Sequence, residues 1–190
     1  MTQDRMPPLS DSEMTPEQAA SLAALTNGPR GKIGGPFVPL LRSPELMNRL
    51  QHVGEYLRYH NSMGLRNSEF SVLIAARHWS QPFEWHIHSV IAKKEGVSEE
   101  TIQAINEGTR PTHMSDDEGI IFDFLGELKS NQSVSDPTWK RAVTRFGEQG
   151  VVDMIAHFGY YSLLAMLMNA ARTPLPDGVK SALVSMPAWD

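Results

Sequence analysis

Hydrophobic residues recur at every third or fourth position along most of the chain, which is the spacing of an amphipathic helix. Leu46, Leu50, Val53 and Leu57 follow this spacing in one such segment. No segment alternates hydrophobic and polar residues as a half-buried strand does, and none repeats with the period of a solenoid. We therefore predict an all-α fold of about seven or eight helices joined by short loops.

Capping residues and prolines mark where these helices begin. Thr15 before Pro16 is a typical helix start, and Ser115 with Glu118 three residues later forms a capping box. Glycines or prolines follow most of the expected ends. The expected helices cover residues 15–27, 43–64, 67–80, 82–94, 98–108, 115 to beyond 128, 135–146 and 151–171. Residues 31–39 are expected to form a loop.

The last expected helix, residues 151–171, is hydrophobic on most of its faces, which predicts burial on several sides, in the core or in a subunit interface. Gly147 and Gly150 are expected to separate it from the preceding helix. The domain organisation that follows is a flexible N-terminal arm over residues 1–14, a single helical domain over 15–178, and a C-terminal arm over 179–190.

Composition and charge narrow the class of protein. Hydrophobic residues make up 41% and charged residues 21% of the 190 positions, as in an ordinary globular domain. The net charge is −5 and basic residues do not cluster, which argues against binding to nucleic acid or to an anionic membrane surface. We find no signal peptide and no uninterrupted hydrophobic run long enough to span a membrane, so a cytoplasmic protein is expected.

The chain contains no cysteine. Disulfides, thiolate nucleophiles and metal sites with cysteine ligands are therefore all excluded. The seven histidines do not pair at the helical spacing that typical metal ligands use, so no metal is expected.

The candidate chemistry lies in two neighbouring helices. Glu84 and His88 are four residues apart and share a helix face, and an antiparallel helix pair would bring Glu69 toward His88 as well. A carboxylate beside an imidazole orients the ring and fixes its tautomer, and such a ring can move a proton to or from a bound substrate. Judged by residue types alone, an ordinary surface pair of Glu84 with His88 is the favoured interpretation.

A resemblance to a known family changes that balance. The order of motifs over residues 35–178, about three quarters of the chain, resembles the carboxymuconolactone decarboxylase family of the AhpD-like superfamily. The matching features are Arg66 and Glu69 near a helix start, Ala75-Ala76-Arg77, Glu84-Trp85-His86-Ile87-His88, residues 92–100, and residues 159–176. The family implies an AhpD-like helical domain built around a helix hairpin.

In the peroxidase branch of this superfamily, a glutamate precedes a Cys-x-x-Cys-x-x-x-His motif. By that spacing the two cysteines fall on Gln81 and Glu84, and the glutamate and histidine fall on Glu69 and His88. Since this chain has no thiol, a cysteine-dependent peroxidase is excluded. The decarboxylase branch keeps the Glu-x-x-x-His pair without cysteines, and it is this cysteine-free branch that the chain resembles.

The resemblance implies a cofactor-free lyase that acts on a small carboxylated lactone or ring-cleavage product of aromatic catabolism, in a homotrimer or homohexamer. His88 would be the general acid and base, with Glu69 and Glu84 orienting it. Arg77, or Arg66 nearby, would hold a substrate carboxylate. Further candidates for substrate contact are Gln81, Trp85, His157 and Tyr161, although the last two are expected mainly to pack in the core. Alternatives are a hydrolase, an isomerase or a metal-dependent oxygenase on the same fold, or a non-catalytic small-molecule binder.

Overall fold

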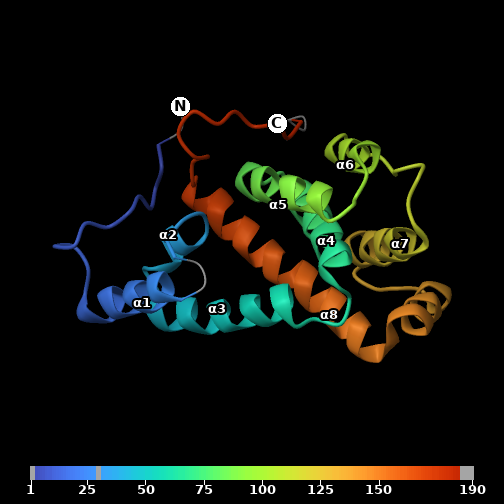
Figure 1. Ribbon diagram of the computed structural model, residues 1–190, viewed down its shortest axis with the longest axis horizontal. Coiled ribbons are helices and arrows are strands. Elements are labelled where there is room, and N and C mark those ends of the chain that lie inside the picture. Colours follow the sequence, from blue (N-terminus) through green and yellow to red (C-terminus); the bar gives the residue numbers. More distant parts are fainter. Residues whose placement is uncertain (1–2, 29–30, 185–190) are drawn as a thin grey trace.

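The computed structural model describes residues 3–28 and 31–184, and these residues form helices and loops without a strand (Figure 1). The all-α prediction is therefore confirmed. The first four helices are α1 (Pro16–Asn27), α2 (Phe37–Leu40), α3 (Pro44–Tyr59) and α4 (Leu65–His78). The remaining four are α5 (Pro82–Lys94), α6 (Glu99–Asn106), α7 (Asp116–Asn131) and α8 (Asp136–Ala171).

Several helix starts follow the capping chemistry of the sequence. At the start of α7, the Ser115 hydroxyl accepts a hydrogen bond from the Glu118 backbone N–H, and the Glu118 carboxylate accepts one from the Ser115 N–H. Thr15 and Gln18 make the same reciprocal pair at the start of α1. Two groups that helix formation leaves unpaired are satisfied at each of these ends.

Several predicted bounds were wrong. The helix predicted over residues 43–64 is α3, which ends at Tyr59. Helix α4 begins at Leu65 instead of residue 67, because the Asn67 and Ser68 side chains bond back to the carbonyl oxygens of Met63 and Gly64 instead of capping the helix. The loop predicted over residues 31–39 contains the short helix α2.

Helix α8 bends where a break was predicted. Gly147 has φ 70° and ψ 173°, which is outside the helical range, and it separates the two predicted segments within one long element. Gly150, the second predicted breaker, is helical and buried. The bend redirects the chain so that residues after it cross the centre of the molecule (Figure 1).

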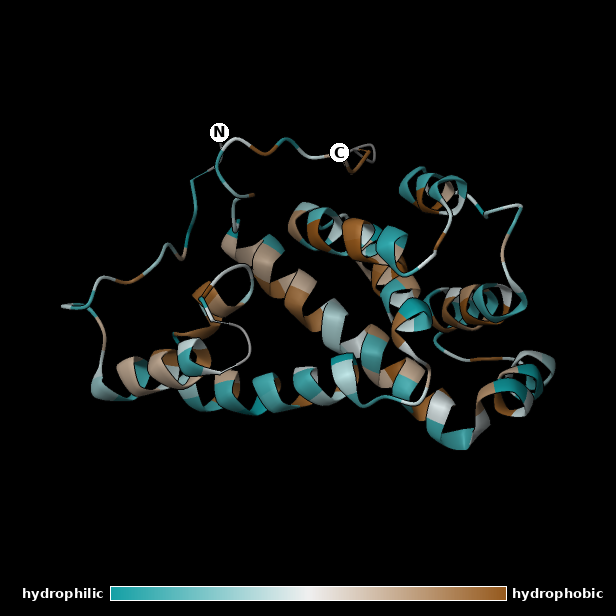
Figure 2. Cartoon of the chain, viewed as in Figure 1, coloured by the Kyte–Doolittle hydropathy of each residue, from teal (hydrophilic) through white to brown (hydrophobic). Residues whose placement is uncertain are grey.

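Helix α4 is the central helix of the fold. All of its side chains from Asn67 to Arg77 are buried, because α5, α8, α7, α6 and α3 all pack against it. Burial on several sides, predicted for the last helix, is thus most complete in α4. Helix α8 buries one face and leaves hydrophobic residues exposed on another, among them Val152, Ile155 and Met166. Its hydrophobic character is visible along most of its second half (Figure 2).

By length and composition alone, α8 could cross a membrane. Half of its most hydrophobic window, 50%, is buried against the rest of the chain, as in the core helix of a folded domain. Together with α4, this buried half forms the framework that positions the candidate site.

Helices α4 and α5 form an antiparallel hairpin on one side of α8, and α3 runs along the other side (Figure 1). Asp153 of α8 ties these parts together, since its carboxylate accepts hydrogen bonds from the Tyr56 hydroxyl at 3.0 Å and from both the N–H and the hydroxyl of Ser62 at 2.8 Å. Ser62 lies in the loop between α3 and α4. The end of α3 is therefore fixed close to the start of α4.

Both predicted arms contact helices where the structure describes them. The Arg5 N–H donates to the Ala171 carbonyl at the end of α8, at 2.8 Å. At the other end of the chain, the Asn106 side chain donates to the Ala182 carbonyl at 2.9 Å and accepts from the Val184 N–H at 2.8 Å. Residues 185–190 of the predicted C-terminal arm lie outside the described residues.

Candidate functional site

The α4–α5 hairpin places a carboxylate against an imidazole. Glu69 is 1% exposed and His88 is 7% exposed, and the distance between Glu69 Oε2 and His88 Nδ1 is 2.7 Å. Because a carboxylate can only accept, Nδ1 carries the proton and donates it. No described residue hydrogen-bonds the other ring nitrogen, Nε2, and His88 lines a cavity. The structure thus brings Glu69 and His88 together as the antiparallel pairing predicts.

Gln81 sets the geometry of the hairpin. Its side-chain oxygen accepts hydrogen bonds from the backbone N–H groups of Phe83 and Glu84 and so caps the start of α5. Its side-chain nitrogen donates to Asn169 of α8 at 3.3 Å. Gln81 is 1% exposed and does not line the cavity. It therefore holds the hairpin in place and does not make the predicted contact with a substrate in this cavity.

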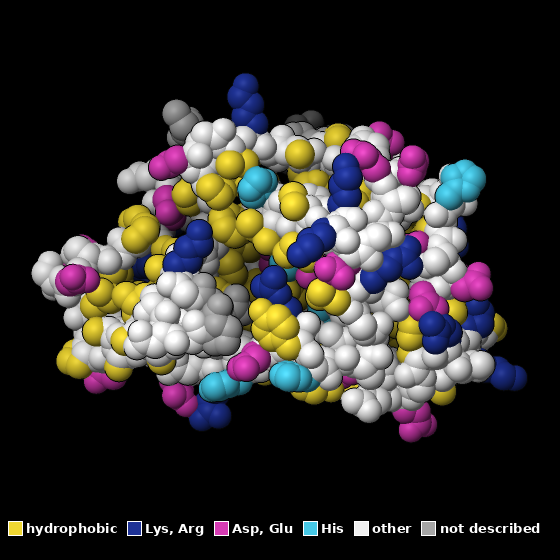
Figure 3. Space-filling model, viewed as in Figure 1, with side chains coloured by type: hydrophobic (Ala, Val, Ile, Leu, Met, Phe, Trp, Pro, Cys, Tyr) yellow, Lys and Arg dark blue, Asp and Glu magenta, His cyan; other side chains and the backbone are white. Residues whose placement is uncertain are grey.

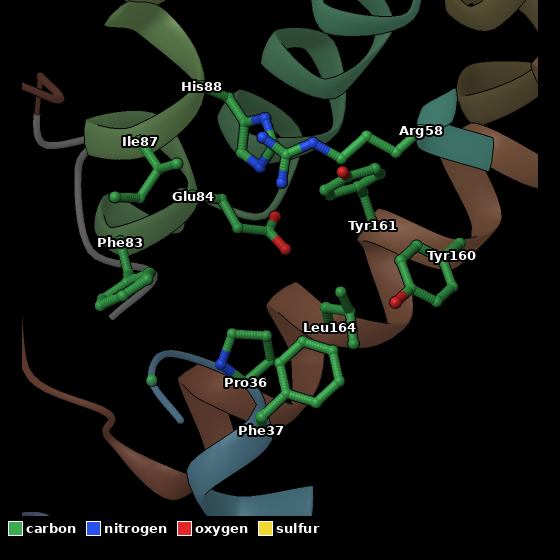
Figure 4. Close-up of a pocket in the computed structure, with 11 residues that line it drawn as sticks. Pro36, Phe37, Arg58, Phe83, Glu84, Ile87, His88, Tyr160, Tyr161 and Leu164 are labelled. Carbon is green, nitrogen blue, oxygen red and sulfur yellow. The ribbon is translucent and has the colours of Figure 1, made fainter. Parts of the chain in front are cut away.

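A cavity of about 130 Å³ lies next to His88, between α5, α8, the end of α3 and the segment that leads into α2 (Figure 4). Three predicted site residues line it: His88, Glu84 and Tyr161. The other lining residues are Gly34, Pro36, Phe37, Arg58, Phe83, Ile87, Tyr160 and Leu164. In the space-filling view, hydrophobic side chains gather around a hollow near the centre of the molecule (Figure 3).

The segment before α2 closes one wall of the cavity by packing on α5. Gly35 has φ 55°, and a Cβ atom at this position would lie 2.6 Å from Cε1 of Phe83. Only glycine combines this backbone conformation with so close an approach. The glycine at position 35 therefore allows the loop before α2 to pack against Phe83 and close this side of the cavity.

Glu84 is the unusual group in the cavity wall. It is 3% exposed, and within residues 3–28 and 31–184 neither of its carboxyl oxygens has a hydrogen-bond partner. Burial raises the pKa of this carboxyl well above its ordinary value, so the neutral acid is the form that the site favours. The prediction that Glu84 orients His88 was wrong, since in the described part of the chain Glu69 makes that hydrogen bond and Glu84 does not.

Tyr161 and His157 form a stack behind His88. The Tyr161 ring meets the His88 ring edge-on at 4.9 Å and stacks on the His157 ring at 5.0 Å. Burial lowers the pKa of His157 to about 3, with the neighbouring His88 adding to the effect, and Nδ1 of His157 lies 3.0 Å from the Ser71 hydroxyl. Burial raises the pKa of Tyr161, which therefore stays a phenol. Tyr161 reaches the cavity, and His157 does not.

The cation in the cavity wall is Arg58. Arg77, which the sequence analysis placed on a substrate carboxylate, lies away from the cavity, and its Nη1 donates to the Val184 carbonyl at 2.6 Å. The alternative, Arg66, forms an ion pair with Glu118 at 2.9 Å. Trp85 is 2% exposed, packs in the core and also lies away from this cavity.

Sequence reasoning missed Arg58, although a signal was present. The residue sits in the last turn of α3, and a short loop returns the chain to α4, where Glu69 lies. A basic residue at the end of the helix before the one that carries Glu69 is therefore a candidate for the same region of the molecule. The hydrophobic lining from Pro36, Phe37 and Leu164 carries no such signal.

Within residues 3–28 and 31–184, no three histidine, aspartate or glutamate side chains converge as ligands for a metal ion. The expectation of a site without a metal stays a prediction.

Comparison with protein-family models finds no match, and neither does comparison with curated protein sequences. Solved structures do match. An uncharacterized peroxidase-related protein from Ralstonia eutropha JMP134, described as an alkylhydroperoxidase AhpD core, has a TM-score of 0.73 at 12% identity, with 93% of this chain and 95% of that chain covered. An uncharacterized peroxidase-related protein from Silicibacter sp. TM1040 has a TM-score of 0.71 at 11% identity, covering 93% and 96%.

A third match is the debrominase Bmp8, as a cysteine-to-alanine variant in complex with 2,3,4-tribromopyrrole. Its TM-score is 0.67 at 13% identity, and 93% of this chain and 94% of that chain are covered. At identities this low, the likeness establishes the fold. The chain has the all-helical AhpD-like fold over nearly its whole length.

Proposed function

We propose that this protein is a cofactor-free acid/base enzyme that acts on a small carboxylated ring compound or lactone, as a carboxymuconolactone decarboxylase-like lyase of the cysteine-free branch. One observation carries the proposal: His88 lines the cavity and also donates a buried hydrogen bond to Glu69. An imidazole held at one nitrogen presents the other nitrogen to whatever occupies that cavity.

The dyad supplies the proton that decarboxylation requires. When the bond between a substrate carbon and its carboxylate breaks, carbon dioxide leaves and the electron pair stays on the carbon, delocalised into an adjacent carbonyl group. The protonated ring of His88 then delivers its Nε2 proton to that carbon. The Glu69 carboxylate stabilises the imidazolium before the transfer and keeps the ring aligned afterwards.

Cavity size and lining support a substrate with a single ring. A cavity of about 130 Å³ is close to the roughly 150 Å³ that accommodates benzene in an engineered protein interior. Phe37, Phe83 and Leu164 offer hydrophobic contacts for the ring. Arg58 offers a positive charge for a carboxylate. The debrominase with the same fold was crystallised with a one-ring compound, a tribromopyrrole.

The test is turnover of muconolactones and related ring-cleavage acids by wild-type protein and by His88→Ala. We expect His88→Ala to lose at least about 100-fold in kcat, because it removes the proton donor, with an unchanged circular dichroism spectrum. His86→Ala is the matched control, since His86 lies on the same helix but does not line the cavity. This control should keep its activity. Equal turnover by wild type and His88→Ala would contradict the proposal, and tight binding without turnover would favour a non-catalytic binder.

A further inference from the structure

Glu84 is an acidic residue in the cavity wall that the proposed proton transfer by His88 does not use. Glu84 and His88 lie one turn apart on α5 and line the same cavity, so one bound molecule can contact both side chains (Figure 4). Glu69 already fills the orienting role at His88. Glu84 is therefore free to act on the substrate itself.

We propose that Glu84 is a neutral hydrogen-bond donor to the oxygen of an enolisable carbonyl group, so that the substrate is a one-ring compound whose reacting carbon lies next to a carbonyl. This inference rests on the proposed acid/base function of His88. It extends that function by naming the group that stabilises the oxygen on which negative charge develops.

The surroundings of Glu84 carry the argument. Glu84 is 3% exposed, and neither oxygen has a hydrogen-bond partner or an ion pair with a described residue. The groups that face the cavity from the packed elements are Arg58 of α3, His88 of α5, and Tyr160 and Tyr161 of α8. An ionised carboxylate buried without partners is strongly disfavoured. A neutral carboxyl group instead has an O–H to offer to a ligand.

The two groups divide one proton-transfer step between them. Nε2 of His88 takes the proton from the carbon next to the carbonyl, and the C–H electron pair moves into the carbonyl to give an enolate. The enolate oxygen accepts the hydrogen bond from Glu84, which keeps its own proton. In the reverse direction, the imidazolium returns its proton to the carbon. Nothing is oxidised or reduced, and Arg58 balances a carboxylate elsewhere on the ring.

The test uses 4-nitrophenol, a one-ring probe whose ionised oxygen resembles an enolate and whose two protonation states absorb differently. Wild-type protein should bind the phenolate. Glu84→Gln keeps a neutral donor of the same size and should bind it within about threefold of wild type. Glu84→Leu keeps the volume but loses the donor and should bind it at least about tenfold more weakly.

Three results would overturn the proposal. Glu84→Gln could bind the phenolate at least about tenfold more tightly, which would show that wild-type Glu84 is charged. Wild-type protein could bind only the neutral phenol. It could also bind no probe at all.

A second measurement addresses Glu84 without any ligand. The infrared difference between wild type and Glu84→Gln should contain the carbonyl stretch of a protonated carboxyl group, and carboxylate bands alone would contradict the inference. Glu69→Gln separates this inference from the proposed function. That variant should lose turnover, because the dyad is broken, yet keep the infrared band and the phenolate binding.

Discussion

At the scale of single residues, burial and hydrogen bonding determine the protonation state of each ionisable group in the site. Glu69 and His88 share one short hydrogen bond, which pairs Oε2 of the buried carboxylate with Nδ1 of the ring. Glu84 has no hydrogen-bond partner among the described residues, and burial raises the pKa of its carboxyl group, which favours the neutral form. His157, behind Tyr161, stays neutral for the same reason. One small region therefore holds an oriented imidazole, a neutral acid and a neutral histidine, each set by its surroundings.

His157 makes the stability of the protein depend on pH. Its pKa is lowered from 6.5 to about 3, so below pH 6.5 the unfolded chain gains a proton that the folded protein does not. The stabilisation is present above pH 6.5 and is lost as the pH falls toward 3, with a slope of up to about 1.4 kcal/mol per pH unit. Glu84 acts in the opposite sense, because its raised pKa makes its contribution fall as the pH rises.

Denaturant unfolding of wild type and His157→Gln between pH 4 and pH 6 checks this prediction, in a window that lies between the two pKa values of His157. The variant should show a shallower dependence of the unfolding free energy on pH. His86→Gln, on a partly exposed histidine, is the control and should keep the wild-type slope. Parallel curves for wild type and His157→Gln would show that His157 is accessible to protons in the folded state.

At the scale of helices, local chemistry predicted most of the elements. The capping boxes at Thr15 and Ser115 mark true helix starts, because they provide hydrogen-bond partners for backbone N–H groups at the helix end. The proline at 82 marks another start, because proline has no N–H that needs a partner. Helix α2 could not be predicted in this way, since four residues are too short for a periodic pattern and are held by packing. The predicted start of α4 at Asn67 was wrong because the Asn67 side chain donates a hydrogen bond to the Met63 carbonyl oxygen and does not cap the helix.

Helices α3 and α8 approach each other closely beside the cavity, at Gly54 and Tyr160. A Cβ atom at Gly54 would lie 2.3 Å from the Tyr160 hydroxyl oxygen, and Tyr160 lines the cavity. We predict that Gly54→Ala lowers the unfolding free energy by about 1–3 kcal/mol, since the buried Tyr160 side chain or the two helices must shift to admit the methyl group. Gly126→Ala in α7 is the control, because nothing lies within 4 Å of the added atom. There we expect a gain of about 0.5–1 kcal/mol in thermal or denaturant unfolding. Equal effects of the two substitutions would contradict the close approach.

At the scale of the whole molecule, the cavity is assembled from segments that are far apart in the sequence. Its walls come from the segment around Pro36, from Arg58, from α5 and from the second half of α8. The Glu69–His88 pair could be predicted because it lies within one hairpin. Arg77 was placed wrongly, because the sequence does not reveal that this end of α4 faces the C-terminal segment. Tertiary packing, which the sequence alone does not reveal, places Arg58 in the cavity wall and Arg77 away from it.

The exposed hydrophobic residues of α8 bear on assembly. Val152 is 63% exposed, Ile155 40% and Met166 44%, all on a helix that the sequence marked for burial. The homotrimer or homohexamer expected from the family resemblance stays a prediction, as does a cytoplasmic location. The molar mass in solution, from light scattering, distinguishes those assemblies from the 21.2 kDa chain alone.

The central claim is that Nε2 of His88, held in place by Glu69, exchanges a proton with carbon in a bound ring compound. The most direct measurement is the incorporation of solvent deuterium into cyclic carbonyl acids, followed by NMR in D₂O with wild type, His88→Ala and Glu69→Gln. The account predicts deuterium at the carbon next to the carbonyl with wild type, and rates lower by at least about 100-fold with both variants. Equal incorporation by all three proteins, or none by wild type with any compound, would contradict it.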